Sequence, residues 1–202
     1  ANLLVLQPTS ESLYVRPGEI VQVDLRVLWL SEEVKACQAF LGYESSYLTA
    51  EAISAGGLDW DELIFAQMTI GGEVDMAIGV LGQTTFGTLA DGTVATVWFR
   101  ATSVEGRTVI TFLPDTTDVH STFLATIDAQ PLWPTTLSSP EITIDGTPPE
   151  VSLVSASQSG RDLLNPANRA FQGEVSIVVA ANDALAGLVG PPVVTVTPNG
   201  LP

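Results

Sequence analysis

Short apolar segments that alternate with polar residues run along most of the chain, separated by turn-forming residues. In residues 20–30, Val21 and Val23 alternate with Gln22 and Asp24. Successive side chains of a strand point to opposite faces, so this alternation predicts a strand with one buried face. Further strands are predicted at residues 3–6, 12–15, 34–43, 49–54, 63–69, 74–81, 93–101, 108–113, 123–126 and 141–144. No helical stripe of three turns is found, so the sequence predicts an all-β fold.

The Pro148-Pro149 pair marks the predicted boundary between two parts of the chain. Proline donates no backbone hydrogen bond and stiffens the chain into an extended spacer. We therefore expect one domain over residues 1–146 and a second part over residues 147–202. The strands predicted in this second part are 151–156, 174–180 and 193–197. A complete sandwich needs about seven strands, so we expect a partial module or a C-terminal extension that packs on the first domain.

The charge of the chain limits the partners it can take. It carries 7 basic and 23 acidic side chains, with a formal net charge of −16. Such a charge repels phosphate backbones and anionic lipid headgroups, and no cluster of Lys or Arg offsets it. No run of 18 apolar residues is present to span a bilayer. We therefore expect neither a nucleic-acid partner nor insertion into a membrane.

The residues on which most catalytic and metal sites depend are scarce. Cys37 is the one cysteine and His120 the one histidine, and the usual nucleophile, phosphate-binding and dinucleotide motifs are absent. The sequence therefore predicts neither an enzyme nor a cofactor site. The acidic stretch Asp59-Trp60-Asp61-Glu62 lacks the spacing of a calcium loop, so we interpret it as a solvated loop, with weak calcium binding as the alternative.

Three segments of the first domain resemble, in chain order, strands of cohesin modules. Residues 17–23 are similar to the first long strand, and residues 36–48 to the third strand with its following turn and buried Leu. Residues 91–101, which enter through a Gly-Thr turn, resemble the eighth strand. The sequence departs from the family at Glu44-Ser45, where Asp-Pro is usual, and residues 116–133 have no counterpart.

The resemblance implies a jelly-roll β-sandwich of about nine strands in a secreted or cell-surface protein. Cohesins are non-catalytic and receive the helices of a dockerin partner on the sheet that holds their third, fifth, sixth and eighth strands. They hold no dockerin-type calcium loops, so calcium would enter through the partner. In the second part, residues 147–151 and 178–184 together with Gly187 are similar to bacterial immunoglobulin-like repeats.

A candidate docking surface follows from strand alternation and this resemblance together. If the larger faces point inward, the outer face of one sheet carries Phe40, Leu81 and Trp98, surrounded by small and polar residues. Aromatic anchors ringed by Arg and amide groups are typical of protein-interaction patches. The predicted partner-binding residues are Gln38, Phe40, Asp75, Ala77, Gly79, Leu81, Trp98 and Arg100.

Two other functions and one other arrangement stay open at this point. A carbohydrate-binding module of the same sandwich class would stack sugar rings on Trp98, Phe40, Trp60 or Trp133. A purely structural spacer of a surface protein would bind no ligand. In the other arrangement, a loop or the stretch 116–133 covers Phe40 and Trp98. The exposure of these two side chains therefore tests the surface prediction most directly.

Overall fold

A computed structural model describes two compact units, Ala1–Gly146 and Thr147–Pro202. Its described residues are 2–9, 13–57, 59–81, 87–114, 121–137, 141–165, 167–168, 174–185, 187 and 193. His120 and most of the strand predicted at 193–197 lie outside them. Within these ranges every regular element is a β-strand, which confirms the predicted fold class, and no helix could cross a membrane.

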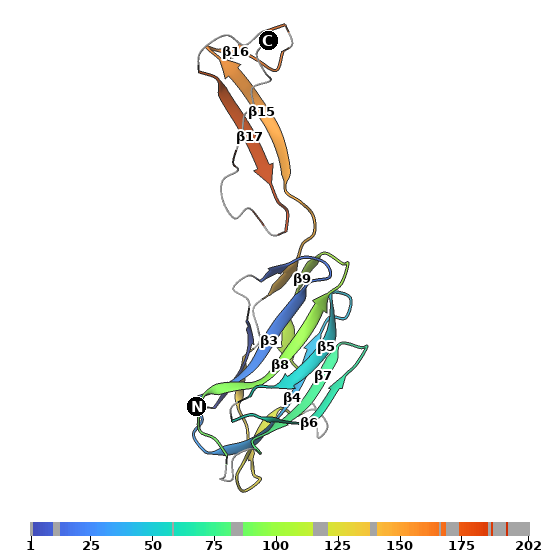
Figure 1. Ribbon diagram of the computed structural model, residues 1–202, viewed down its shortest axis with the longest axis vertical. Helices are drawn as coiled ribbons and strands as arrows, with labels where there is room; N and C mark the ends of the chain where they lie inside the picture. The colour runs from blue at the N-terminus through green and yellow to red at the C-terminus, as the bar shows by residue number, and fades with distance from the viewer. Residues whose placement is uncertain are drawn as a thin grey trace. The chain divides into compact units, whose positions relative to one another are not determined.

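Five strands of the first unit form one sheet in the order β13-β1-β3-β8-β5. Figure 1 shows β3, β8 and β5 of this sheet side by side. They are β1 (Leu3–Pro8), β3 (Ile20–Leu28), β5 (Leu48–Ala55), β8 (Gly92–Ala101) and β13 (Thr135–Leu137). β13 runs parallel to β1, and the other neighbours are antiparallel. In β3, Val21 and Val23 are buried whereas Gln22 and Asp24 are only partly covered, as their alternation predicts.

A second sheet has the order β12-β11-β4-β7-β6, and β10 also pairs with β4. Its strands are β4 (Val34–Tyr43), β6 (Glu62–Met68), β7 (Glu73–Gly79), β10 (Ile110–Phe112), β11 (Phe123–Thr126) and β12 (Pro131–Leu132). β10 pairs with residues 41–43 of β4, and β11 pairs with residues 34–38. One edge of β4 is therefore shared by two short strands that residues 113–122 connect.

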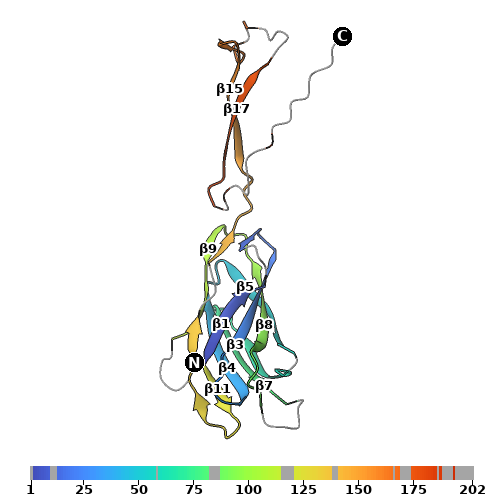
Figure 2. The ribbon, with the colours of Figure 1, turned by 90° about the vertical axis from the view of Figure 1, so that its left-hand side faces the viewer.

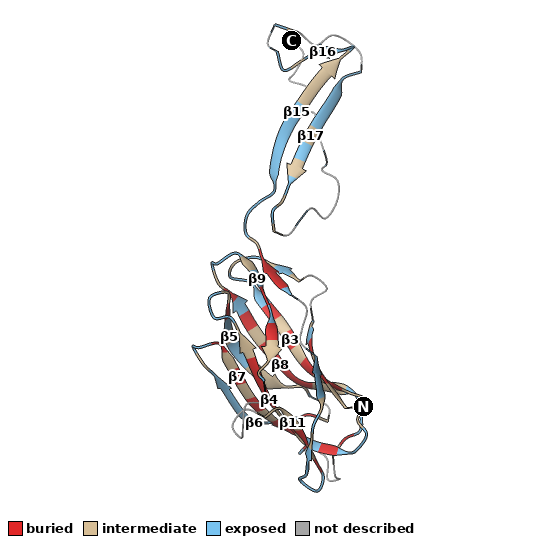
Figure 3. Cartoon of the chain, turned by 180° about the vertical axis from the view of Figure 1, so that it is seen from behind, coloured by how far each residue is buried: buried red, intermediate tan, exposed pale blue. Residues whose placement is uncertain are grey.

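The two sheets pack face to face and enclose the core, seen as the buried segments in Figure 3. Tyr43 of β4 and Phe99 of β8 meet across the core edge to face, with ring centroids 5.2 Å apart. A small third sheet, β2-β14-β9, comprises β2 (Tyr14–Val15), β9 (Gly106–Thr108) and β14 (Ile142–Ile144); Figure 2 shows β9 beside one end of the sandwich. The first unit is a jelly-roll sandwich with more than nine strand segments, because several span two or three residues.

The second unit contains one antiparallel sheet in the order β16-β15-β17. Its strands are β15 (Glu150–Gln158), β16 (Arg161–Asp162) and β17 (Ser176–Asn182). No described residue of this unit reaches the buried class. The resemblance of this unit to an immunoglobulin-like repeat stays a prediction.

Candidate functional site

The strands β4 and β7 lie side by side, and alternation divides their side chains between the core and the outer face of the second sheet. Cys37, Ala39 and Leu41 of β4 belong to the core, so Gln38 and Phe40 point outward. In β7 the core residues are Val74, Met76, Ile78 and, just beyond the strand, Val80. The residues between them that point outward are Asp75, Ala77 and Gly79. The structure therefore gathers these five predicted site residues on one face.

The strand register arranges the outward side chains in rows across the sheet. One row joins Phe123 of β11, Gln38 of β4, Ala77 of β7 and Phe65 of β6. The next row joins Phe40, Asp75 and Gln67, and a third joins Ala36, Gly79 and Glu62. Because directly paired residues project to the same face of a sheet, these rows form one continuous surface.

The most exposed apolar part of this surface lies over β6 and β7. β6 has a bulge between Leu63 and Phe65, so Ile64 is the extra residue. Cδ1 of Ile64 lies 2.9 Å from the position that a Cβ atom on Gly79 would take, and Cγ of Leu81 lies 3.6 Å from it. Ile64, Phe65 and Leu81 are 56%, 49% and 59% exposed. These three side chains, with Ala77 and Gly79, are named here the β6–β7 patch.

Ile64 and Phe65 were absent from the predicted site, although residues 63–69 were predicted as a strand. The bulge puts two consecutive residues on the outer face, and strict alternation cannot anticipate that. The available signal was the run Leu63-Ile64-Phe65-Ala66, which has no polar residue at the position where an ordinary half-buried strand would carry one.

Phe40 points outward but is buried, with 9% of its surface exposed, so the prediction of an exposed Phe40 anchor was wrong. Its carbonyl accepts a hydrogen bond from the backbone N–H of Leu113 at 2.9 Å, and its own N–H donates to Oγ1 of Thr122 at 3.2 Å. Nε2 of Gln38 donates to the carbonyl of Ser121 at 3.2 Å. The residues on either side of the segment 115–120 therefore lie along the edge of β4.

Trp98 and Arg100 lie on the other sheet, so the prediction that they share one surface with Phe40 and Leu81 was wrong. β8 pairs with β3 and β5, and Trp98 stands between Gln22 and Ala52 on the outer side of that sheet. Alternation fixes which side chains share a face of a strand, but not which sheet the strand joins. The resemblance put residues 91–101 in the same sheet as residues 36–48, but the edge of β4 opposite β7 pairs with β10 and β11.

Arg100 is instead part of an ion pair on the surface of the first sheet. Its guanidinium donates to both carboxylate oxygens of Glu51, and Nη1 donates to the carbonyl of Gly18 at 2.7 Å. The hydrogen bond from Arg100 lowers the pKa of Glu51 below its ordinary value, and the same bond raises the pKa of Arg100. Trp98 next to this pair is half-buried.

Two carboxylates of the acidic stretch 59–62 accept hydrogen bonds from other segments of the fold. A carboxylate oxygen of Asp59 accepts a hydrogen bond from Oγ1 of Thr88 at 2.6 Å, and Oδ1 of Asp61 accepts one from the backbone N–H of Leu81 at 2.9 Å. Across the residues that the structure describes, no three His, Cys, Asp or Glu side chains come together as a metal site. Asp61 thus anchors the backbone of Leu81, whose side chain is the most exposed one of the β6–β7 patch.

The aromatic residues considered for sugar stacking are not collected on one surface. Trp60 is 2% exposed and Phe40 is buried as well, while Trp98 lies on the first sheet. Trp133 is exposed and packs against Phe123 with ring centroids 5.8 Å apart. A row of exposed, coplanar rings is therefore not formed by these four residues.

The electrostatic character of the second sheet around the patch is acidic. Glu62 of β6 and Glu73 and Asp75 of β7 occupy outward positions, and neither strand contains a Lys or Arg.

In the core behind this face, burial raises the pKa of the Cys37 thiol to about 12, so this thiol is neutral and inert at physiological pH.

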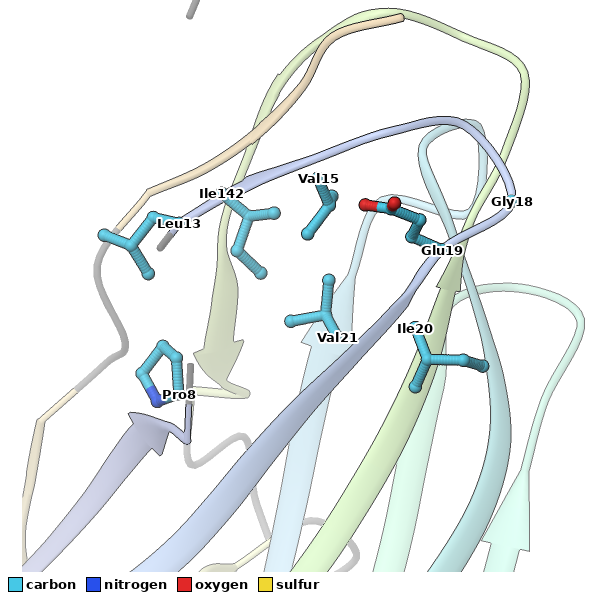
Figure 4. Close-up of a pocket in the computed structure, with 8 residues that line it drawn as sticks. All are labelled: Pro8, Leu13, Val15, Gly18, Glu19, Ile20, Val21 and Ile142. Carbon is cyan, nitrogen blue, oxygen red and sulfur yellow. The ribbon is translucent and has the colours of Figure 1, made fainter. Parts of the chain in front are cut away.

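An apolar pocket of about 390 Å³ lies near one end of the sandwich, and none of the predicted site residues lines it. Its lining residues, drawn in Figure 4, are Pro8, Leu13, Val15, Gly18, Glu19, Ile20, Val21 and Ile142. Glu19 contributes the one charged group, and its carboxylate already accepts the backbone N–H of Arg16 at 2.8 Å.

Known structures resemble the first unit throughout its length. The match to the cohesin CaCohA2 of Clostridium acetobutylicum has a TM-score of 0.58 at 16% identity and covers 73% of this chain and 93% of that one. The first unit has the cohesin fold. The sixth cohesin of Acetivibrio cellulolyticus scaffoldin B, solved with a Cel5 dockerin, matches with a TM-score of 0.56 at 12% identity over 70% of this chain and 99% of that one.

The cohesin fold also occurs outside cellulosomes among the matching structures. A non-cellulosomal cohesin of the archaeon Archaeoglobus fulgidus matches with a TM-score of 0.54 at 18% identity, covering 72% of this chain and 91% of that one. No protein-family model and no curated protein matches the sequence. At such low identities the structural similarity shows the fold of the first unit alone, and the function has to be argued from its surface.

Proposed function

We propose that the first unit is a non-catalytic, cohesin-like docking module that binds a dockerin-like protein partner through the outer face of the second sheet. The observation that carries this proposal is the β6–β7 patch, where Ile64, Phe65 and Leu81 are about half exposed side by side on the outer face of the sheet. Exposed apolar groups gathered within a polar rim mark protein-interaction sites. Support comes from the fold, since matching cohesins were solved in complex with dockerins.

The polar residues around the β6–β7 patch indicate which kind of partner surface would fit it. Glu62, Gln67 and Asp75 stand next to the apolar residues in the strand register, and Gln38 continues the row toward β11. A helix with an apolar ridge flanked by Lys or Arg fits such a surface. Opposite charges steer encounter, so association with this partner is expected to be faster at low salt.

The proposal is tested by titrating the chain against a panel of dockerins and soluble polysaccharides, with one variant on each sheet. Phe65→Ala removes an anchor of the patch and is expected to weaken dockerin binding about tenfold or more. Trp98→Ala removes an aromatic side chain of the opposite sheet and is the matched control, expected to bind like the unaltered chain. Saturable sugar binding that Trp98→Ala abolishes, without dockerin binding, would establish the carbohydrate-binding alternative. Absence of any ligand would favour the structural spacer.

The proposed docking role also implies where the protein works and how calcium affects binding. The module is proposed to work outside the cell, in a secreted or surface-attached protein. Calcium is proposed to act through the partner, whose loops it would fold, because Asp59 and Asp61 of this chain are engaged with Thr88 and Leu81.

A further inference from the structure

A second apolar cluster lies on the outer face of the second sheet, at the edge formed by β11 and β12. In β11, Leu124 is buried in the core, so its neighbour Phe123 points outward, where it pairs with Gln38 of β4. The ring of Trp133, just beyond β12, lies against Phe123 with ring centroids 5.8 Å apart. Trp133 is 56% exposed, slightly more than Phe65 of the β6–β7 patch. These two side chains are named here the Phe123–Trp133 pair.

The pair and the patch stand at the two ends of one row of the sheet. The row runs from Phe123 through Gln38 and Ala77 to Phe65. Neighbouring strands are about 4.8 Å apart, so the three strand spacings of this row separate the clusters by about 14 Å. Between them, Ala77 has a short side chain, and the amide of Gln38 donates to the carbonyl of Ser121 at 3.2 Å. The two apolar clusters therefore flank a small side chain and a hydrogen-bonded one.

The separation of the two clusters fits an α-helix that lies along the strands. A helix with its side chains is about 10–12 Å across, so its two flanks would reach both clusters while its underside rests on Ala77. A strand added to either edge of the sheet would pair with β6 or with β12 and would reach one cluster alone. The face of the sheet, rather than its edge, therefore determines the kind of partner.

The side chains of the two clusters suit the apolar ridge of a helix better than a sugar chain. Ile64 and Leu81 present no flat ring to a sugar and offer no hydrogen bond to its hydroxyl groups. The ring planes of Phe123 and Trp133 are inclined to each other by 56°, so this pair does not form one flat platform. Aliphatic and aromatic groups at these positions can pack instead against the Leu, Ile or Val side chains of a helix.

The charges around the two clusters indicate the polar side of this helix. The strands β6, β7, β11 and β12 contain no Lys or Arg, whereas Glu62, Glu73 and Asp75 occupy outward positions. The Lys of β4, Lys35, donates from Nζ to the carbonyl of Ile127 at 2.8 Å. An acidic face is complementary to a helix that carries Lys or Arg along its borders.

We infer that one α-helix of the partner lies along β4 and β7 and contacts the β6–β7 patch with one flank and the Phe123–Trp133 pair with the other. This inference rests on the proposed docking function and deepens it, because it names Trp133 as a second anchor and gives the direction of the bound helix. The helix is amphipathic, with apolar side chains toward the sheet and basic side chains along its borders.

Calorimetric titration of the full chain with a panel of dockerins tests the second anchor. Trp133→Ala is expected to weaken binding about tenfold or more, as Phe65→Ala does, because each removes a large aromatic contact. Tyr14→Ala is the matched control, since Tyr14 is an aromatic residue of similar exposure, 52%, in the small third sheet. It is expected to bind like the unaltered chain. Thermal melting of the variants checks that each of them folds.

A second variant tests the path of the helix without removing any packing contact of Trp133. Ala77→Trp puts a bulky ring in the middle of the row, where it would collide with a helix lying between the clusters, so affinity should fall about tenfold or more. Ala52→Trp is the matched control, because Ala52 lies beside Trp98 on the outer face of the first sheet. Equal binding by Ala77→Trp and Ala52→Trp would overturn the proposed path.

The outcomes separate this inference from the docking proposal. Loss of binding in Phe65→Ala together with full binding in Trp133→Ala would overturn the second anchor and leave the docking function standing. A chain that binds no dockerin of the panel would overturn both. Saturable binding of a soluble polysaccharide that Trp133→Ala abolishes would mean that a sugar chain, and not a helix, occupies the row.

Discussion

Gly79 of β7 leaves free the space that Ile64 of β6 fills on the outer face of the second sheet. A Cβ atom on Gly79 would lie 2.9 Å from Cδ1 of Ile64, a separation that real Cβ atoms essentially never show. The side chain that must give way is the flexible end of an exposed residue. Gly79 therefore determines the position of Ile64, and with it the shape of the β6–β7 patch.

Gly79→Ala is expected to weaken dockerin binding several-fold while changing the free energy of unfolding by less than about 1 kcal/mol. The reason is that Ile64 can rotate away into solvent but then no longer fits the partner. Gly71→Ala is the matched control, because a Cβ atom there would meet only Oγ1 of Thr69, at 3.7 Å. Calorimetric titration and urea unfolding measure the two effects. Unchanged binding in Gly79→Ala would remove Ile64 from the docking surface.

Trp60 is a core residue whose indole N–H finds no acceptor in the described part of the chain. A buried donor without a partner costs about 1–3 kcal/mol. Trp60→Phe removes this donor and keeps most of the apolar ring, so we expect a loss of stability below about 1.5 kcal/mol. Trp60→Ala should cost about 3–5 kcal/mol, because it leaves a large cavity. Urea unfolding of both variants measures the difference, and a loss on Trp60→Phe as large as that on Trp60→Ala would contradict this prediction.

The ion pair between Glu51 and Arg100 predicts a pH dependence of stability. The hydrogen bond from Arg100 holds the pKa of Glu51 below its ordinary value of 4.5. The stabilisation is therefore complete above the ordinary pKa and is lost as the pH falls through the lowered pKa of the folded state. The pair is exposed, so the effect is small and is screened by salt.

Glu51→Gln is the variant that isolates this effect. Its unfolding midpoint should fall less steeply with acid than that of the unaltered chain. NMR titration of the unaltered chain should place the pKa of the Glu51 carboxyl below the ordinary value of a glutamate. Parallel acid profiles of the two proteins would contradict the assignment.

The strands of the first unit could be predicted because their alternation is regular. In β3, each apolar residue from Val21 to Val27 lies in the core, and the Cys37, Ala39 and Leu41 series of β4 does so as well. Burial of one face imposes a period of two on such strands, so their inward and outward residues can be determined from sequence.

The sheet to which each strand belongs could not be predicted in the same way. Trp98 has the same alternation in either sheet, and only its pairing with Gln22 and Ala52 separates it from Phe40. The hydrogen-bond partners of the Phe40 backbone are Leu113 and Thr122, which are distant in sequence. Long-range pairing and a bulge at Ile64 therefore determine the candidate site, and neither leaves a periodic signal.

Removal of divalent cations should separate the stability of this chain from its binding. Asp59 and Asp61 hold Thr88 and Leu81 through hydrogen bonds, and the described residues contain no cluster able to bind a metal ion. With excess EDTA the melting temperature of the chain alone is expected to stay unchanged, whereas dockerin binding should be lost because the partner's calcium loops unfold. Asp61→Ala should weaken binding in the presence of calcium, since Leu81 loses its anchor, and Glu44→Ala, an exposed acidic residue outside the patch, is the control. A fall in melting temperature with EDTA would mean that the acidic stretch 59–62 binds a structural ion.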